Sequence, residues 1–180
     1  MSSPGIREGD TAQPRRGQAF PIVLVLDRLR SAHNVGNIFR LAEVARVEQV
    51  LTCGYTASPP HPKLAKTARG CDQLVPSRHL DDALTAVTEL QTAGYRVVAV
   101  ETVTTAATIW EATFAFPVAF VFGNEALGID ADALAACDEV VQLPCFGCKN
   151  SLNVGNCAAV VVYRALACLA ADGVLDGGQP

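Results

Sequence analysis

The sequence has little charge, because only 18% of its 180 residues are Asp, Glu, Lys or Arg. It has no uncharged apolar run of about 18 residues, the minimum for a membrane-spanning helix, so we expect no membrane span. Residues 1–19 hold no apolar stretch of the kind that a secretory signal carries. Without a repeat or a linker, the chain predicts one cytoplasmic domain over residues 20–172, between flexible tails at 1–19 and 173–180.

What the sequence does have is apolar surface and an uneven distribution of charge. Half of the residues are hydrophobic and the mean hydropathy is +0.25, which predicts a partner over part of the surface, most simply a second copy. Residues 1–80 hold 11 basic and 6 acidic residues, whereas residues 81–180 hold 3 and 12. Such asymmetry permits a basic face on a protein of net charge −4, although an ordinary solvated surface would also explain it.

The seven cysteines are an odd number and predict reduced thiols rather than disulfides, since no secretion signal is present. Cys145 and Cys148 form a C-x-x-C pair, which suggests a redox site or half of a zinc site. No second pair and no neighbouring histidine completes a tetrahedral set. We therefore expect no metal, and the redox role of the pair stays open.

Short apolar runs alternate with helix-like segments along the chain. The runs at 21–26, 47–53, 95–100, 118–122 and 139–143 predict buried strands, with a weaker strand candidate at 72–76. Helices are expected at 34–46, 80–93, 130–136 and 153–171, and residues 55–69 predict a loop around one short helix. This alternation predicts an α/β fold, with a mainly parallel sheet flanked by helices.

Three loops follow strands and carry polar residues at the place where ligands bind in open α/β sheets. The first loop (residues 27–40) contains Asn34 and, six residues later, Arg40 at the start of a predicted helix. The second loop (residues 122–129) reads FGNEALGI, and the third loop (residues 143–154) reads LPCFGCKNSLNV. Taken singly, each is explained equally well by helix capping or an ordinary turn. A guanidinium group at a helix start also suits phosphate.

Taken in order, the three loops form a pattern. Asn-x-x-x-x-x-Arg, then Gly-Asn-Glu-x-x-Gly, then Ser-Leu-Asn-Val, each after a strand, resembles the SpoU/TrmH branch of the SPOUT RNA methyltransferases over residues 22–169. That resemblance implies a C-terminal deep trefoil knot and a homodimer formed through the knot region and the C-terminal helix. It also implies S-adenosylmethionine as cofactor. Cofactor-binding residues would be Thr102, Gly123, Leu143, Ser151 and Leu152.

The implied chemistry is methylation of a ribose 2′-hydroxyl in tRNA or rRNA. The catalytic residues would be Arg40, Asn34, Glu125, Ser151 and Asn153. Because a guanidinium group gives up its proton reluctantly, we expect Arg40 to hold the phosphate beside the target ribose. The phosphate or a water would then help to accept the proton. Contacts to the RNA backbone would come from Arg28, Arg30, Lys63, Lys66, Arg69 and Lys149.

The competing interpretation is a non-catalytic RNA-binding module that kept the fold. Such a module needs the basic residues but not a cofactor pocket. The enzyme is therefore favoured by the presence of Asn34, Arg40, Glu125, Ser151 and Asn153. Which RNA, which nucleotide, and whether ribose or base is methylated do not follow from the sequence.

Overall fold

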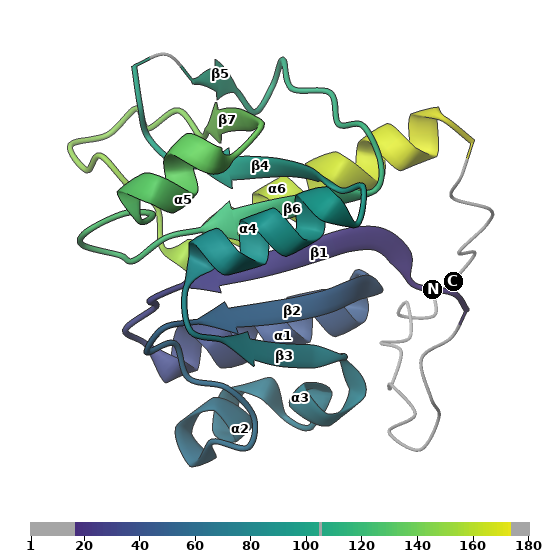
Figure 1. Ribbon diagram of the computed structural model, residues 1–180, viewed down its shortest axis with the longest axis vertical. Coiled ribbons are helices and arrows are strands. Elements are labelled where there is room, and N and C mark those ends of the chain that lie inside the picture. Colours follow the sequence, from purple (N-terminus) through teal and green to yellow (C-terminus); the bar gives the residue numbers. More distant parts are fainter. Residues whose placement is uncertain (1–16, 105, 174–180) are drawn as a thin grey trace, which may run out of the picture.

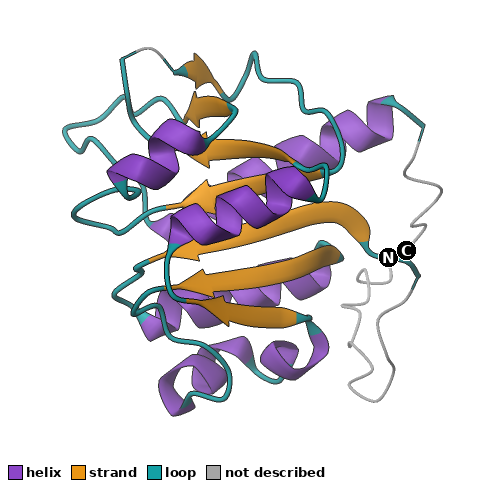
Figure 2. Ribbon diagram, in the orientation of Figure 1, coloured by secondary structure: helices purple, strands orange, loops and turns teal. Residues whose placement is uncertain are grey.

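The computed structural model describes residues 17–104 and 106–173, so nearly all of the two predicted tails lie outside the described residues. A seven-stranded sheet in the order β3-β2-β1-β6-β4-β7-β5 organises the chain, and every strand pair in it is parallel (Figures 1 and 2). The strands are β1 (Phe20–Asp27), β2 (Val47–Cys53), β3 (Ser77–Leu80), β4 (Arg96–Val100), β5 (Ala107–Thr108), β6 (Val118–Phe122) and β7 (Glu139–Gln142). The helices are α1 (Ala32–Val44), α2 (Pro62–Ala68), α3 (Cys71–Leu74), α4 (Ala83–Thr92), α5 (Ala131–Ala136) and α6 (Val154–Ala171). The predicted α/β class with a parallel sheet is confirmed.

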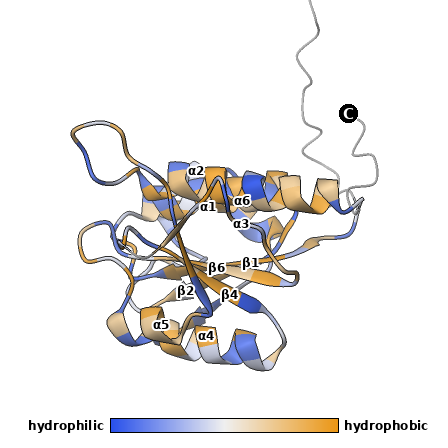
Figure 3. Cartoon of the chain, turned by 90° about the horizontal axis from the view of Figure 1, so that it is seen from above, coloured by the Kyte–Doolittle hydropathy of each residue, from blue (hydrophilic) through white to orange (hydrophobic). Residues whose placement is uncertain are grey.

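Helices cover both faces of the sheet, with α1, α2, α3 and α6 on one side and α4 and α5 on the other (Figure 3). Strand β1 shows why the core divides in the same way, because successive side chains of a strand point to opposite faces. Leu24 and Leu26 join the cluster under α1 and α6, whereas Val23 and Val25 join the cluster under α4. A strand buried on both faces needs a continuous apolar run, which is what its sequence has.

The region after α2 differs from the prediction. Residues 72–76 were expected to form a strand, but Cys71–Leu74 is the short helix α3, and the strand β3 follows at Ser77–Leu80. Strand β3 lies at the edge of the sheet and its side chains are only partly buried or exposed, so it lacks the apolar run that reveals central strands. The helix expected from residue 80 begins instead at Ala83, because the Asp82 side chain caps it by accepting a hydrogen bond from the Thr85 N–H.

Helix α1 begins earlier than expected, with Ser31 as its N-cap. Arg40 therefore lies deep in α1 and not at its start, so a helix N-terminus does not assist its side chain in binding phosphate. Packing against α2 fixes this helix closely: a Cβ added at Gly36 would lie 2.0 Å from Thr67 Oγ1 and 2.5 Å from the Leu64 carbonyl oxygen. Only glycine lets the two helices approach to this distance.

By length and composition alone, α6 is apolar enough to cross a membrane, although the sequence analysis found no such segment because Arg164 interrupts it. In the fold, one side of α6 packs into the core under the sheet through Ala158, Val161, Val162, Ala165 and Leu169. The Arg164 guanidinium donates to the carbonyl oxygens of Trp110 and Ala112. Helix α6 is thus part of the helical layer that covers one face of the sheet.

Candidate functional site

The carboxyl ends of β1, β4, β6 and β7 meet at one edge of the parallel sheet, and all three loops leave from that edge. The first loop connects β1 to α1, the second connects β6 to α5, and the third connects β7 to α6. In the sequence the first loop (residues 27–40) lies far from the second and third loops (residues 122–129 and 143–154). The topology, with β6 inserted between β1 and β4, brings them together.

Asn34 joins all three loops through its side-chain amide. Its Nδ2 donates to Glu125 Oε1 of the second loop at 3.0 Å, and its Oδ1 accepts from Asn153 Nδ2 of the third loop at 3.2 Å. The other Glu125 oxygen accepts from the Arg30 N–H at 3.1 Å. Asn153 also caps α6, since its Oδ1 accepts from the N–H groups of Gly155 and Asn156. Three residues expected to belong to one site are therefore in direct contact.

The Glu125 carboxyl group is held in its ionised form. Partial burial on its own would raise its pKa, but hydrogen bonds donated by the Arg30 N–H, by its own N–H and by the Asn34 amide outweigh this and lower the pKa below the ordinary value. Glu125 is consequently a fixed negative charge at neutral pH, and it accepts hydrogen bonds without being able to donate one.

A cavity of about 600 Å³ opens beside this network, between the second and third loops and the end of β4. All five residues expected to bind a cofactor line it: Thr102, Gly123, Leu143, Ser151 and Leu152. Glu125 and Asn153 also line it, whereas Asn34 lies behind them. This volume lies in the range of small-molecule and cofactor pockets.

The wall made by the second loop is closely packed. A Cβ at Gly123 would lie 2.2 Å from the Ile129 backbone nitrogen and 2.3 Å from the carbonyl carbon of Gly128, so no larger residue fits there. Asn124 is buried; its Nδ2 donates to the Arg28 carbonyl and to Tyr55 Oη, both at 2.7 Å. The side chain of Asn124 thus ties the second loop to the first.

Glu101 is a pocket residue that the sequence analysis did not identify. It follows β4, lines the cavity, and accepts hydrogen bonds from the Ile129 N–H at 3.1 Å and from the Thr102 N–H at 2.9 Å. The signal available in the sequence was its position directly after a buried strand, which it shares with Thr102. Its carboxylate anchors the second loop from the side opposite Asn124.

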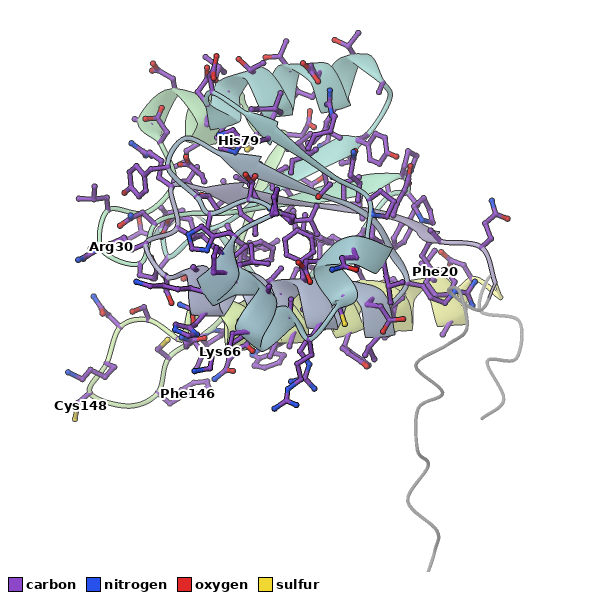
Figure 4. All side chains as sticks on the ribbon, turned by 90° about the horizontal axis from the view of Figure 1, so that it is seen from below. Phe20, Arg30, Lys66, His79, Phe146 and Cys148 are labelled. Carbon is purple, nitrogen blue, oxygen red and sulfur yellow. The ribbon has the colours of Figure 1, made fainter. Side chains whose placement is uncertain are left out.

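The six cationic side chains expected to contact RNA differ in whether they form ion pairs within the protein. The Arg28 guanidinium is paired with Asp27 at 3.1 Å and with Asp130 at 3.3 Å, and the hydrogen bond to Asp27 raises its pKa further above the ordinary value. Within the described residues the ion pairs include none of the other five, Arg30, Lys63, Lys66, Arg69 and Lys149, all of which are exposed. Arg30 and Lys66 lie toward the end of the molecule opposite Phe20 (Figure 4).

Arg40 lies outside the cavity that the other predicted catalytic residues surround. Its side chain is exposed on α1, and it has no ion-pair or hydrogen-bond partner among residues 17–104 and 106–173. One turn earlier on the same helix, Asn37 lies beside Gly155 of α6. Arg40 is therefore close to the surface where α1 and α6 meet.

The cysteines in this part of the fold are thiols. Cys145 and Cys148 are exposed on the third loop, and Cys145 and Cys157 both line the cavity. Burial, followed by the proximity of Cys145 and Glu101, raises the pKa of Cys157 to about 11, so this thiol stays protonated at neutral pH. In the described part of the chain, no group of three or more His, Cys, Asp or Glu side chains is arranged to hold a metal ion.

Residues 21–163 match the family model described as the SpoU rRNA Methylase family. The chain belongs to this family. The matched segment contains the parallel sheet except for Phe20, the first residue of β1, and the three loops at the cavity end of the sheet. The sequence-based assignment to the SpoU/TrmH branch is thereby confirmed.

Curated relatives share the domain but are longer. The chain is 30% identical over 142 residues to an uncharacterized tRNA/rRNA methyltransferase of Synechocystis sp., covering 79% of this chain and 52% of that protein. It is 27% identical over 146 residues to the 23S rRNA (guanosine-2′-O-)-methyltransferase RlmB of Vibrio parahaemolyticus, covering 81% and 59%. The chain thus spans little more than half the length of these relatives.

Solved structures of related proteins have the same fold. A structure described as an RNA 2′-O ribose methyltransferase superposes with a TM-score of 0.75 at 27% identity, over 88% of this chain and 60% of that one. A structure whose description names the 2-OH methylation of C/U34 on tRNA superposes with a TM-score of 0.73 at 26% identity. The superposition covers 83% of this chain and 97% of that one. The Aquifex aeolicus TrmH/SpoU tRNA modifying enzyme has a TM-score of 0.79 at 19% identity, which supports the fold alone.

Proposed function

We propose that this chain is an S-adenosylmethionine-dependent RNA methyltransferase that acts on a ribose 2′-hydroxyl of tRNA or rRNA. The observation that carries the proposal is the junction of the three loops, where Asn34 contacts both Glu125 and Asn153 at the edge of a cofactor-sized cavity. A relative and a solved neighbour whose descriptions specify 2′-O-methylation support the same reaction.

The residues around the cavity fit S-adenosylmethionine. Leu143 and Leu152 offer apolar surface for the adenine ring, while Gly123 and Ser151 expose backbone groups that can read its edge. The anionic side chains of Glu101 and Glu125 line the same cavity and suit a ligand that carries a sulfonium and an ammonium group. When bound, the cofactor would supply an electrophilic methyl group.

The chain's own contribution would be to hold the target ribose and dispose of its proton. In-line transfer needs the hydroxyl oxygen roughly 3–3.5 Å from the methyl carbon and aligned with the bond that breaks. Glu125 cannot donate a proton, so we assign to it and to Asn34 the role of fixing the loops. Arg40 would bind the phosphate next to the ribose, and that phosphate or a water would help to accept the hydroxyl proton.

We also propose that the protein is a homodimer that pairs through α6 and the part of the knot region next to it, which leaves the tip of the third loop at Phe146 uncovered. On α6 the side chains of Val160 and Tyr163 are exposed one turn apart, and on α1, which contacts α6, the side chain of Val44 is also exposed. Covering this apolar face would explain the high mean hydropathy. Because Arg40 lies near this face and outside its own cavity, the dimer would bring it toward the cavity of the second copy.

Two further features, a knot in the chain and a cytoplasmic location, belong to the same proposal. One is a deep trefoil knot in the C-terminal part of the chain, as the resemblance to the SpoU/TrmH family implies. A cytoplasmic location fits an enzyme that acts on tRNA or rRNA.

The direct test is calorimetry with S-adenosylmethionine, followed by mapping of 2′-O-methyl sites in RNA from cells with and without the gene. We expect a dissociation constant in the micromolar range, typical of cofactor-dependent enzymes, and loss of one or a few methylated positions. If no binding occurs at millimolar cofactor, the protein is an RNA-binding module that only kept the fold. Methyl groups lost from bases and not from ribose would reassign the reaction.

Arg40→Lys tests the catalytic assignment, since lysine keeps the charge but loses the planar two-pronged geometry. We expect kcat to fall at least tenfold while cofactor affinity stays unchanged, because Arg40 does not line the cavity. Near-normal turnover by this variant would remove Arg40 from the reaction. Arg96→Lys serves as the matched control, because Arg96 pairs with Asp138 and Glu139 at the other end of the sheet.

A further inference from the structure

The third loop carries a side chain that neither the fold nor the cavity uses. Phe146 is 90% exposed, more than any other large hydrophobic side chain of the described residues. Its loop neighbours Leu143 and Cys145 line the cavity, but Phe146 does not. A single exposed apolar side chain is common on protein surfaces, but an aromatic ring offers a large apolar face to a ligand, and this one directly follows a residue that lines the cavity.

The surroundings of Phe146 are cationic. Residues 143–154 contain no Asp or Glu, and Lys149 follows three residues after Phe146 without an ion-pair partner in the described part of the chain. Phe146, Lys66 and Arg30 all lie toward the same end of the molecule, and the third loop projects from that end (Figure 4).

An aromatic face among cations suits single-stranded nucleic acid. Successive bases stack on aromatic rings while lysine and arginine follow the phosphates, and this combination works for any base because each has a π-face. In a duplex the faces of the bases are covered by their neighbours, and RNA proteins therefore read loops and bulges where bases are unstacked. A second copy seated here would have to cover the unpaired Lys149 as well, which is a less complementary contact.

We propose that Phe146 stacks on an unpaired RNA base beside the methylated ribose, with Lys149 contacting the adjoining phosphate. This deepens the proposed function and rests on it: the substrate is then a single-stranded loop or bulge and not a duplex. Because the rest of the loop forms a cavity wall, a base stacked on Phe146 places its neighbouring ribose at the cavity mouth. Phe146 is accordingly a positioning residue for the RNA and makes no contact with the cofactor.

The test measures the affinity of four variants for two probes, a short single-stranded oligouridylate and a blunt RNA duplex of equal length. We expect Phe146→Ala and Phe146→Leu to weaken binding of the single strand on the order of tenfold, the usual effect of losing one stacked base. Phe146→Trp should restore it, and duplex affinity should not change. Leu84→Ala removes an exposed apolar side chain from α4 on the other face of the sheet and should bind like the wild type.

A second readout depends on contact rather than on affinity. With 5-iodouridine in the oligonucleotide, irradiation should cross-link the RNA to Phe146 in the wild type, with the adduct located by mass spectrometry, and the leucine variant should lose it. Wild-type affinity in Phe146→Leu, an equal loss for the duplex, or a dimer that dissociates in Phe146→Ala would overturn the proposal. Calorimetry of the wild type with S-adenosylmethionine tests the proposed function separately. If the cofactor does not bind, the proposed function fails, whatever the Phe146 variants show.

Discussion

The second and third loops form two walls of one cavity, yet they are built differently. In the second loop the backbones of Asn124 and Gly128 bond to each other, at 3.0 and 2.9 Å, and Glu101 and Asn124 add further side-chain contacts. In the third loop the hydrogen bonds of the described residues are a weak one from the Cys145 thiol and those of Asn153 at its end. Residues 145–153 are exposed. One wall is therefore fixed before a ligand arrives, and the other is free to adapt to it.

The same substitution in each loop tests this contrast most strongly. Gly123→Ala should destabilise the protein by about 3 kcal/mol and remove cofactor binding, because its Cβ would overlap backbone atoms that cannot move independently. Gly147→Ala should change stability by no more than about 0.5 kcal/mol, since nothing lies within 4 Å of its Cβ. Chemical denaturation and calorimetry measure both effects. Equal effects for the two variants would show that the loops do not differ as described.

Glu125→Gln tests the link between the two walls. A glutamine offers one acceptor where Asn34 and the Arg30 N–H need two, so one donor loses its partner. We expect a loss of about 1 kcal/mol at neutral pH, small because these bonds are exposed. Thermal unfolding of the wild type and the variant gives the difference.

That difference should depend on pH. The pKa of Glu125 is lower in the folded protein than its ordinary value, so its stabilising contribution is complete above the ordinary glutamate pKa and is lost as the pH falls through the folded value. The stability gap between wild type and Glu125→Gln should therefore be constant near neutral pH and shrink in acid. A gap that widens as the pH falls would mean that the carboxyl group is protonated in the folded protein.

The smallest effect is expected for the double change Cys145→Ser and Cys148→Ser. Both thiols are exposed, so stability should change by less than about 0.5 kcal/mol. Cofactor affinity should change at most twofold, because Cys145 lines the cavity from an exposed loop with few hydrogen bonds and Cys148 does not line it. Stoichiometric zinc in the wild type, or activity that responds to oxidant only when both thiols are present, would reveal a role that the geometry does not require.

The sequence predicts the centre of this molecule better than its edges. The bounds of β2 and β6 were predicted to the residue. Strand β6 is continuously apolar, as a strand buried in the middle of a parallel sheet must be, whereas β2 was recognised from its apolar residues around the polar Glu48 and Gln49. The edge strands β3 and β5 were missed, since one is polar and the other has two residues. Their positions depend on the neighbouring strand and not on their own side chains.

Some residues of the site were likewise predicted correctly, and others were missed or misplaced. The five expected cofactor residues, which the resemblance to the SpoU/TrmH family implied, line one cavity, and the loops that carry them follow strand ends. Glu101 was missed, since a single acid after a strand is indistinguishable from a surface charge until its partner Ile129 is known. Arg40 was placed at a helix start because motif spacing does not locate the cap, and Ser31 begins the helix earlier.

The contact at Gly36 sets the distance between helices α1 and α2. Helix α2 bears Lys63 and Lys66, and it rests on α1 at the point where a methyl group is absent. A side chain at residue 36 would overlap α2 at Thr67 and Leu64, so we expect it to push α2, and with it these two cations, away from α1. The distance between these lysines and the cofactor pocket, and hence the RNA shapes that fit, would then depend on the single hydrogen atom that Gly36 has in place of a side chain.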